Sequence, residues 1–412
     1  MTLSVCMIGL GYIGLPTAAI LASHGVKAIG VDLNPSTVET INQGRIHIVE
    51  PGLEEIVKDV VARKMLHATT KPVAADAFII AVPTPFKNNY EPDMAYVEAA
   101  TLSIAPVLQK GNTVILESTS PVGSVEKIAH WLAQARPDLS FPHQAGEEAD
   151  IALVYCPERV LPGNIVHELV TNDRVVGGMT PRCAKRGADV YKHFVRGECM
   201  LTDARTAEMC KLTENAFRDV NIAFANELSL ICDHLKINVW ELIRFANHHP
   251  RVKILQPGPG VGGHCIAVDP WFIVHSSPEQ AKLIRQAREV NDGKPQFVIN
   301  QVKTAAKDIT NPTIACLGLA FKADIDDLRE SPAIHIVETL ISEKIGKLLV
   351  VEPHIKELPK SLIHESVKLV NAEEAITSAD IVLLLVNHTE FKSYGAQAKA
   401  KRVIDTRGIW SI

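Results

Sequence analysis

The feature that most constrains this chain is a glycine-rich turn near its beginning. An apolar run at residues 3–8 leads into Gly9-Leu-Gly-Tyr-Ile-Gly14, residues 15–23 have helical composition, and a second apolar run at 27–31 ends at Asp32. Glycines allow a tight turn and the close approach of a pyrophosphate, and an acidic side chain after the second strand binds ribose hydroxyls. The pattern predicts a β-α-β unit that binds a dinucleotide.

NAD is the predicted cofactor of this unit. The residues expected to bind it are Gly9, Gly11, Tyr12, Ile13, Gly14 and Asp32. Because the Asp32 carboxylate would repel a 2′-phosphate, NAD is favoured over NADP. Thr84 and Thr119 follow later strands at their carboxyl ends, where cofactors lie in open α/β sheets, although either can instead cap a turn. The alternative, a glycine turn without a ligand, is disfavoured by Asp32 and by the β-α-β context.

Alternating apolar and helical segments predict an α/β fold with two Rossmann-like domains. The first series indicates a doubly wound parallel sheet, with apolar runs at 77–82, 114–117 and 151–155 between helical stretches such as 94–108 and 125–135. The second series begins after Asn311-Pro312, with apolar runs at 313–319, 348–351, 381–386 and 403–404. A smaller α/β domain is therefore expected at the carboxyl end of the chain.

A helical region joins these two domains. Residues 204–235 contain no proline or glycine, so we expect a spine helix about 48 Å long at 1.5 Å per residue. Residues 291–295, Asn-Asp-Gly-Lys-Pro, are expected to break the helical pattern that precedes them. The predicted domains are residues 1–200, 201–300 and 301–412.

The composition excludes several classes of partner. The net charge of −5, with acids and bases mixed along the chain, provides no basic surface for nucleic acid. Eight cysteines without a CxxC pair favour reduced thiols in the cytoplasm. His248, His249 and His264 lack a metal-binding spacing, so no metal is expected. No apolar stretch is long enough to suggest a membrane span or a signal peptide.

A cysteine on a second glycine-rich segment suggests covalent chemistry. The segment reads Gly258-Pro-Gly-Val-Gly-Gly-His-Cys265-Ile-Ala-Val-Asp269. Glycines let the backbone fold tightly and expose the sulfur to a ligand. A thiolate can add to an aldehyde, and the thiohemiacetal can lose a hydride to give a thioester that water hydrolyses. The alternative is a glycine loop that binds only phosphate, with Cys265 incidental.

Polar residues on the predicted spine helix suggest a substrate cleft. Lys211, Asn215 and Arg218 share one narrow face, with Glu208 beside them. A solvated stripe is the default interpretation. Here the neighbours are apolar almost all round, so we expect the helix to be buried and its polar stripe to face a cleft; these neighbours are Cys210, Leu212, Phe217, Val220, Ile222, Phe224, Ala225, Leu228 and Leu230. Lys211 can stabilise an alkoxide or move a proton, and Asn215 can donate to the same oxygen.

Four basic residues are candidates for contacts with an anionic ligand, although each alone is more often a surface residue. They are Arg159, Arg251, Lys322 and Arg329. Lys322 follows a predicted strand and Gly318-Leu-Ala-Phe321, so it stands at the strand-end crevice of the second α/β domain. A diphosphate is the ligand expected there.

Taken together, these motifs resemble the nucleotide-sugar 6-dehydrogenase family along essentially the whole chain. Besides the two glycine segments, the resemblance rests on residues 82–85, 118–123, Tyr155-Cys-Pro-Glu-Arg159, Glu208-Met-Cys-Lys-Leu-Thr-Glu-Asn215 and Gly318-Leu-Ala-Phe-Lys322 through Asp327-Leu-Arg-Glu-Ser331. The resemblance implies an NAD-binding domain, a central domain that dimerises and carries catalytic residues, and a carboxyl-terminal domain that binds a UDP-sugar. It also implies at least a homodimer built on the long helix.

The resemblance implies a role for each candidate residue. Cys265 matches the nucleophile, Lys211 the essential lysine, and Asn215 its oxyanion partner. Asp269 and Thr119 match residues that position the catalytic water, and Glu158 matches a carboxylate near it. The residues implied in sugar-nucleotide binding are Arg159, Val160, Lys211, Asn215, Arg218, His249, Arg251, Gly262 and Lys322, with Arg251 supplied by the neighbouring subunit. Arg329 matches a residue that reaches into the same active site and is assigned to the cofactor.

The resemblance implies that the substrate is UDP-N-acetyl-D-mannosamine, oxidised at C6 for a bacterial surface polysaccharide of the enterobacterial common antigen type. Ile266-Ala-Val-Asp269 stands where the UDP-glucose branch of the family usually carries Pro-Lys-Asp, and His249-Pro-Arg251 fits the N-acetylmannosamine branch. UDP-N-acetylglucosamine and UDP-glucose are the alternatives. A 3-hydroxyacid-type dehydrogenase is an alternative with another mechanism. It would form one NADH per substrate, whereas the thioester route forms two, and it would need no thiol. A nucleotide-sensing binding module would have no use for Cys265, Lys211 and Asn215 together.

Overall fold

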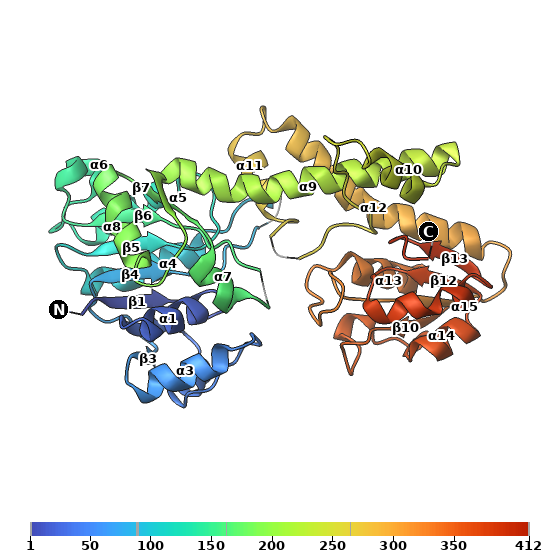
Figure 1. The fold of residues 1–412 in the computed structure, drawn as a ribbon, viewed down its shortest axis with the longest axis horizontal. Coiled ribbons are helices and arrows are strands. Elements are labelled where there is room, and N and C mark those ends of the chain that lie inside the picture. Colours follow the sequence, from blue (N-terminus) through green and yellow to red (C-terminus); the bar gives the residue numbers. More distant parts are fainter. Residues whose placement is uncertain (1, 88–89, 162, 264, 411–412) are drawn as a thin grey trace. The chain divides into compact units, whose positions relative to one another are not determined.

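The computed structural model describes residues 2–87, 90–161, 163–263 and 265–410. The chain divides into two compact units, the N-terminal unit Met1–Glu214 and the C-terminal unit Asn215–Ile412. Each unit contains a twisted sheet with helices packed on it (Figure 1).

The sheet of the N-terminal unit has the strand order β3-β2-β1-β4-β5-β6-β7-β8. Its strands are β1 (Ser4–Ile8), β2 (Lys27–Val31), β3 (Leu66–Thr69), β4 (Ala77–Ile80), β5 (Thr113–Leu116), β6 (Ala152–Tyr155), β7 (Arg174–Gly178) and β8 (Cys199–Asp203). Strand β7 pairs with β6 in the antiparallel direction, and the other neighbours are parallel. The predicted doubly wound sheet is confirmed. Strands β2 and β3 lie on one side of β1, and β4 and the later strands lie on the other side. Dinucleotides bind in such sheets at this change of direction, between β1 and β4.

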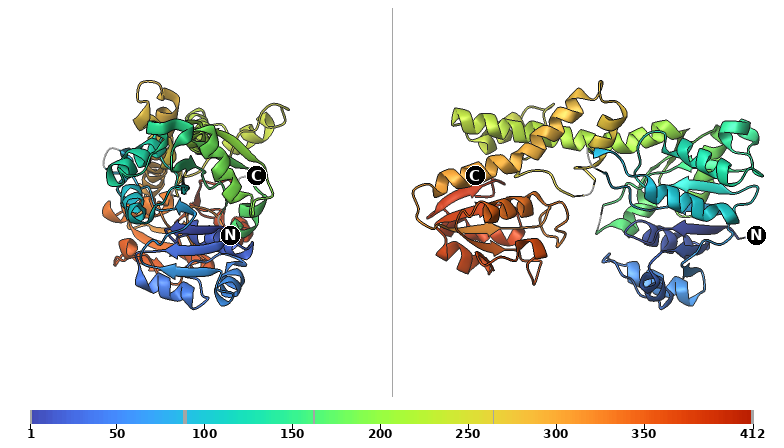
Figure 2. Two further views of the ribbon diagram at one scale, coloured as in Figure 1. Left: turned by 90° about the vertical axis from the view of Figure 1, so that its left-hand side faces the viewer. Right: turned by 180° about the vertical axis from the view of Figure 1, so that it is seen from behind.

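Helices cover both faces of this sheet (Figure 2). They are α1 (Gly14–Ser23), α2 (Pro35–Asn42), α3 (Leu53–Ala62), α4 (Ala95–Ile104), α5 (Ser124–Ala135), α6 (Pro142–Ala145), α7 (Ile165–Thr171) and α8 (Pro181–Tyr191). Successive strand residues point to opposite faces. Val5 and Met7 accordingly pack with α1 and α8, whereas Cys6 and Ile8 pack with α4 and α5. The continuous apolar runs of the sequence arise because both faces are buried.

The C-terminal unit repeats this plan on a smaller scale. Its sheet is parallel and has the order β11-β10-β9-β12-β13. The strands are β9 (Thr313–Leu317), β10 (Lys347–Val351), β11 (Val367–Leu369), β12 (Ile381–Leu384) and β13 (Arg402–Asp405). The helices are α10 (Val239–Ala246), α11 (Asp269–Ser276), α12 (Lys282–Ala306), α13 (Pro332–Ser342), α14 (Ala372–Ser378) and α15 (Gly395–Ala398). The predicted spine is helix α9, Ala204–Leu235.

Helix α12 continues through residues 291–295, so the predicted helix break there was wrong. Proline inside a helix costs about 3 kcal/mol relative to alanine. Tertiary contacts offset this cost, because Asn291 is buried and its Nδ2 donates to Asp219 Oδ1 of α9 at 2.8 Å. Pro295 itself is buried in α12. Contacts with residues distant in sequence therefore override the local signal.

The expectation that the apolar neighbours bury helix α9 was also wrong in part. Phe217 and Phe224 are 68% and 51% exposed in the single chain, whereas four polar residues of α9 are buried: Glu208, Asn215, Asp219 and Asn226. An exposed apolar surface of this kind is typical of an interface. Within the described ranges, no helix has the length and apolar composition needed to cross a membrane.

Candidate active site

The glycine turn after β1 is shaped by two close approaches of the backbone. Gly9 has a φ of 95°, and a Cβ added there would lie 2.5 Å from the carbonyl oxygen of Ala81. A Cβ on Gly14 would lie 1.9 Å from the Gly9 oxygen. A Cβ on Gly11 would meet nothing within 4 Å among the described residues, so the space over Gly11 is open to a ligand. Helix α1 also has no side-chain cap at Ile13, so no capping side chain competes with a pyrophosphate at its N-terminus.

Asp32 stands at the end of β2, beside this turn. Its Oδ2 accepts from Leu10 N–H at 3.2 Å and its Oδ1 accepts from Asn34 N–H at 2.9 Å. The side chain remains half-buried and retains acceptor capacity. The turn and the carboxylate thus have the arrangement that NAD requires, and Tyr12 is exposed beside them.

The loops after β4 and β5 are tied together at the carboxyl edge of the sheet. Ser118 Oγ donates to the carbonyl oxygen of Val82 at 2.7 Å and accepts from Val82 N–H at 2.9 Å. Thr84 Oγ1 donates to the carbonyl oxygen of Thr119. This bond fixes the loop after β4 to the loop after β5. Thr119 is half-buried at the same edge.

Lys211 and Glu158 meet within the N-terminal unit. Lys211 Nζ donates to the carbonyl oxygen of Glu158 at 2.7 Å. Desolvation raises the pKa of the Glu158 carboxyl to about 7, an effect that the nearby Lys211 charge opposes. Glu158 also accepts from Val160 N–H, and Arg159 pairs with Glu214 at 2.7 Å. An acid with a pKa near neutrality beside an ammonium is suited to moving a proton.

Two buried acids, Glu208 and Glu117, make contacts near this edge of the sheet. Glu208 of α9 accepts from the N–H groups of Gly123 and Val125 at 2.6 and 2.9 Å, which anchors the start of α5. Burial raises the pKa of Glu208 to about 7, although these two donors oppose the shift. Glu117, directly after β5, is buried against Arg174 at 3.4 Å. Glu208 was noted in the sequence only as a neighbour of Lys211; its role as a helix anchor depends on a contact 83 residues away.

Three predicted catalytic residues come together within the C-terminal unit. Cys265 is exposed and forms no disulfide. Its carbonyl oxygen accepts from Asp269 N–H at 2.9 Å, so the cysteine lies one turn before the start of α11. Asp269 is buried, and its Oδ2 accepts from Asn215 Nδ2 of α9 at 2.5 Å. The long helix therefore fixes the carboxylate beside the thiol loop. His264, next to Cys265, lies outside the described residues.

The glycines of the thiol loop allow it to pack closely on the carboxyl-terminal α/β region. A Cβ on Gly262 would lie 2.4 Å from the Glu330 carbonyl oxygen, and a Cβ on Gly258 would lie 2.6 Å from Arg407 Nη1. Gly263 has a φ of 84° and lies against the ring of Phe321. The backbone can make these contacts only without side chains.

A buried polar network holds the start of this loop, and sequence reasoning missed it. Gly258 N–H donates to Asn226 Oδ1 at 2.9 Å, and Asn226 Nδ2 donates to Asn291 Oδ1 at 2.8 Å. Asp219 accepts from Asn291 and from Arg288, the latter at 2.6 Å. The spacing of the buried polar residues on α9, at 208, 215, 219 and 226, was the available signal.

The other residues of the C-terminal unit that were predicted to bind substrate or cofactor lie on its surface. Arg218, His249, Arg251, Lys322 and Arg329 are exposed. Arg251 N–H donates to His249 Nδ1 at 3.4 Å, and Arg329 forms a bidentate pair with Asp327 at 2.6 and 2.8 Å. These positions leave the side chains of Arg218, His249, Arg251 and Lys322 accessible to a ligand or a partner.

One cluster of the C-terminal unit has the residue types of a metal site. Asp324, His354, His388 and Glu390 place one ligand atom each within 4.8 Å of one another. However, hydrogen bonds engage both ring nitrogens of His388: Nδ1 accepts from Asp324 N–H at 2.9 Å, and Nε2 pairs with Glu352 at 3.0 Å. A metal would have to displace one of these bonds, so the cluster favours a structural role.

Comparison with known proteins places these features in one family. Sequence profiles of the UDP-glucose/GDP-mannose dehydrogenase family match the chain with the NAD binding domain over residues 3–195, the central domain over 205–293 and the UDP binding domain over 315–412. The chain is 63% identical over 409 residues to the NDP-N-acetyl-D-galactosaminuronic acid dehydrogenase of Ralstonia nicotianae, covering 99% of this chain and 96% of that protein.

Two further relatives carry a different substrate in their names. The UDP-N-acetyl-D-mannosamine dehydrogenase of Escherichia coli K12 is 61% identical over 416 residues, which cover 99% of each protein. The solved UDP-D-ManNAc dehydrogenase of Pyrococcus horikoshii superposes with a TM-score of 0.87 at 38% identity, covering 98% of this chain and 96% of that one.

Proposed function

Because this chain belongs to the UDP-glucose/GDP-mannose dehydrogenase family, we propose that it oxidises C6 of UDP-N-acetyl-D-mannosamine to the uronate through a cysteine thioester. The chain is an NAD-dependent dehydrogenase, and its substrate class is a UDP-sugar. When bound, NAD supplies the hydride acceptor for each of two oxidations. The observation that carries the proposal is the exposed Cys265 one turn before Asp269, whose carboxylate Asn215 holds.

The first oxidation converts the C6 alcohol to an aldehyde. Lys211 takes part as the group that stabilises the developing alkoxide or accepts its proton, with Asn215 donating to the same oxygen. The half-buried Glu158, whose pKa desolvation raises to about 7, can exchange a proton with Lys211 or with water. These assignments rest on the contact between Lys211 and Glu158 and on the family's chemistry.

The second oxidation requires the thiol. The Cys265 thiolate adds to the aldehyde carbon, and the resulting thiohemiacetal loses a hydride to give a thioester. Water then adds to the thioester carbon, and the thiolate leaves with formation of the carboxylate and release of the two protons of the water. Asp269 and Thr119 are assigned to the positioning of this water.

The identity of the sugar rests on the relatives. The N-acetylmannosamine assignment is supported by the Escherichia coli and Pyrococcus proteins. The Ralstonia relative, at 63% identity, favours a second candidate that the sequence motifs did not suggest, an N-acetylgalactosamine nucleotide. Both sugars carry an acetamido group at C2 and differ in stereochemistry, which small changes in pocket shape can discriminate. UDP-N-acetylglucosamine and UDP-glucose remain further alternatives.

The exposed apolar side of α9 supports the proposed homodimer. Phe217, Phe224 and Ile231 recur every seven residues and are 68%, 51% and 46% exposed in the single chain. A helix face with this period is suited to packing against another helix. In this proposal the central residues 201–300 dimerise, Arg251 completes the partner's substrate site, and residues 301–412 bind UDP. The product would enter a bacterial surface polysaccharide.

A panel of nucleotide sugars tests the proposal. UDP-N-acetylmannosamine, UDP-N-acetylgalactosamine, UDP-N-acetylglucosamine and UDP-glucose are each offered with NAD or NADP, and the NADH formed per sugar consumed is counted. We expect two NADH per sugar, preference for NAD, and the highest kcat/KM for UDP-N-acetylmannosamine. One NADH per sugar would exclude the thioester route. A higher kcat/KM for another sugar would reassign the substrate and leave the chemistry intact.

A further inference from the structure

Lys294 is a buried cation outside the site described above. It lies on α12, is 5% exposed, and its Nζ stands 4.4 Å from the centre of the Phe297 ring. Among the described residues, no hydrogen bond or ion pair is found for its ammonium group. Burial lowers the pKa of Lys294 to about 8, although the nearby Asp233 carboxylate opposes the shift. An unpaired charge is expensive to bury, so its position calls for a compensating group.

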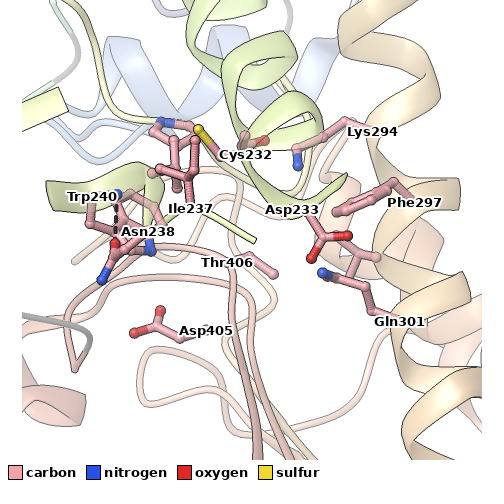
Figure 3. Close-up of a pocket in the computed structure, with 14 residues that line it drawn as sticks. Cys232, Asp233, Ile237, Asn238, Trp240, Lys294, Phe297, Gln301, Asp405 and Thr406 are labelled. Atoms are coloured by element: carbon pink, nitrogen blue, oxygen red, sulfur yellow. Dashed lines mark hydrogen bonds between the residues drawn. The ribbon is translucent and has the colours of Figure 1, made fainter. Parts of the chain in front are cut away.

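The Lys294 ammonium faces a cavity within the C-terminal unit (Figure 3). The cavity has a volume of about 280 Å³ and is bounded by the end of α9, by α10, by α12 and by the end of β13. This volume is near the lower limit for pockets that hold small organic ligands. Pro257, directly before Gly258 of the thiol loop, forms part of its wall.

The walls of the cavity combine apolar surface with a few polar groups. Trp240, Phe297 and Ile237 provide the apolar part, and the Gln301 amide provides a donor and an acceptor. Asn238 uses its Oδ1 to cap α10, through Trp240 N–H at 3.0 Å and Glu241 N–H at 3.2 Å. A ligand that fits this lining has an apolar body and a polar head.

The charged groups around Lys294 indicate the charge of that head. Asp233 and Cys232 on α9 and Asp405 on β13 are the titratable groups that share the cavity with it. Asp405 accepts from the N–H groups of Arg407, Gly408 and Trp410, and burial raises the pKa of the Cys232 thiol. No carboxylate among the described residues lies within ion-pairing distance of Lys294. A single negative charge would satisfy Lys294, whereas a second would face Asp233 and Asp405.

We propose that this cavity is a second ligand site, which binds a small organic monocarboxylate through Lys294 and packs its apolar body between Trp240 and Phe297. The site is independent of the proposed sugar oxidation. Its bordering residue Pro257 places it next to the loop that carries Cys265.

The probe for this proposal is 4-methylpentanoate, titrated into the full-length enzyme by calorimetry or ligand-observed NMR. We expect the probe to bind and its neutral isostere, 4-methylpentanamide, to bind at least about tenfold more weakly, because a neutral amide oxygen replaces the carboxylate that pairs with the ammonium. Lys294→Met keeps the length and removes the charge, so it should weaken carboxylate binding about 10- to 100-fold. Replacement of a buried cation by methionine is compatible with folding, and a thermal melt verifies it.

Lys303→Met is the matched control. Lys303 is on the same helix but is partly exposed and pairs with Glu343 at 2.6 Å, so this variant should bind the probe like the wild type. Affinity should also fall as the pH is raised from about 7 to about 9, because the ammonium form is lost. Unchanged binding to Lys294→Met, absence of binding to the wild type, or equal competition by chloride or inorganic phosphate would each overturn the proposal. Equal competition by chloride or phosphate would show that Lys294 binds anions without selectivity. Absence of binding to the wild type would be the result if a second copy of the chain covered the cavity.

Discussion

The first turns of the two sheets are built alike. Gly9 after β1 and Gly318 after β9 have φ values of 95° and 93°. Their N–H groups donate to Val31 and Val351, the last residues of the neighbouring strands, each at 2.8 Å. An added Cβ would lie 2.5 Å from Ala81 O in one turn and 2.4 Å from Val386 Cβ in the other. Each turn is followed in sequence by an acid directly after the second strand, Asp32 or Glu352.

The two acids differ in what their oxygens already bind. Asp32 is half-buried and accepts from two N–H groups. Glu352 is 4% exposed and accepts from Leu319, Ala320 and His354 N–H, and its Oε2 also pairs with His388 Nε2. Asp32 therefore remains available to a ribose, whereas Glu352 locks its own turn. The same position in the same topology is a predicted ligand site in one sheet and a structural bond in the other.

The largest effects are expected from alanine at the two turn glycines. In Gly9→Ala, the strained φ and the clash with Ala81 should lower NAD affinity at least about 100-fold. In Gly318→Ala, the same defects should lower the free energy of unfolding by at least about 2 kcal/mol while NAD affinity stays within about twofold. NADH fluorescence titration and denaturant unfolding measure the two quantities.

Gly11→Ala is the matched control for this pair. A Cβ at Gly11 meets no protein atom within 4 Å in the described residues, so unfolding should be unchanged while NAD affinity falls. If Gly318→Ala weakened NAD as strongly as Gly9→Ala does, the distinction between the two turns would be lost.

A smaller effect is expected at Asp32. Asp32→Ala should weaken NAD about 10- to 100-fold, since hydrogen bonds to a charged group contribute about 1.5–3 kcal/mol. It should also narrow the preference for NAD over NADP, because the repulsion of the 2′-phosphate is removed. The ratio of kcat/KM values for the two cofactors measures this change, and an unaltered ratio would contradict the assignment of Asp32.

The smallest effect is expected at Glu352. Glu352→Gln should lower the free energy of unfolding by about 1–3 kcal/mol, because hydrogen bonds to a buried charge are replaced by weaker ones. NAD affinity should not change. Denaturant unfolding monitored by far-UV circular dichroism gives the first quantity and NADH titration the second.

The pH dependence of unfolding distinguishes stabilisation by the charge of Glu352 from stabilisation by the packing of its side chain. Burial raises the pKa of Glu352, but hydrogen bonds from His388 and the Leu319 backbone outweigh it, so the pKa lies below the ordinary value of 4.5. The stabilisation is therefore complete above that value and is lost as the pH falls through the lowered pKa. The wild type should lose this stability in acid and Glu352→Gln should not. If the unfolding free energies of the two proteins changed with pH in parallel, the charge of Glu352 would contribute nothing to stability.

Sequence patterns predicted the parts of the molecule that depend on neighbouring residues. The apolar runs and the turn at Gly9 led to the two sheets because strand alternation and glycine conformation are local properties. The continuation of α12 past Asn291 and the exposure of Phe217 were not predictable in this way. Both depend on which distant residues the helix contacts.

The candidate sites show the same division. Cys265 was identifiable because its glycine loop marks it, whereas Lys294 carries no local signal that distinguishes it from a surface lysine. The network of Asp219, Asn226 and Asn291 could have been suspected from the polar spacing on α9, but its partners on α12 could not. Burial of a polar residue is informative only when its partners are known.

The most direct test of the covalent route is peptide mass spectrometry of the enzyme quenched in acid during turnover with UDP-N-acetylmannosamine and NAD. We predict a mass increase, equal to the sugar-nucleotide acyl group, on the peptide that contains Cys265, and none on the peptides of Cys210 or Cys232. Formation of two NADH per sugar with no adduct on Cys265, or with the adduct on another cysteine, would contradict it.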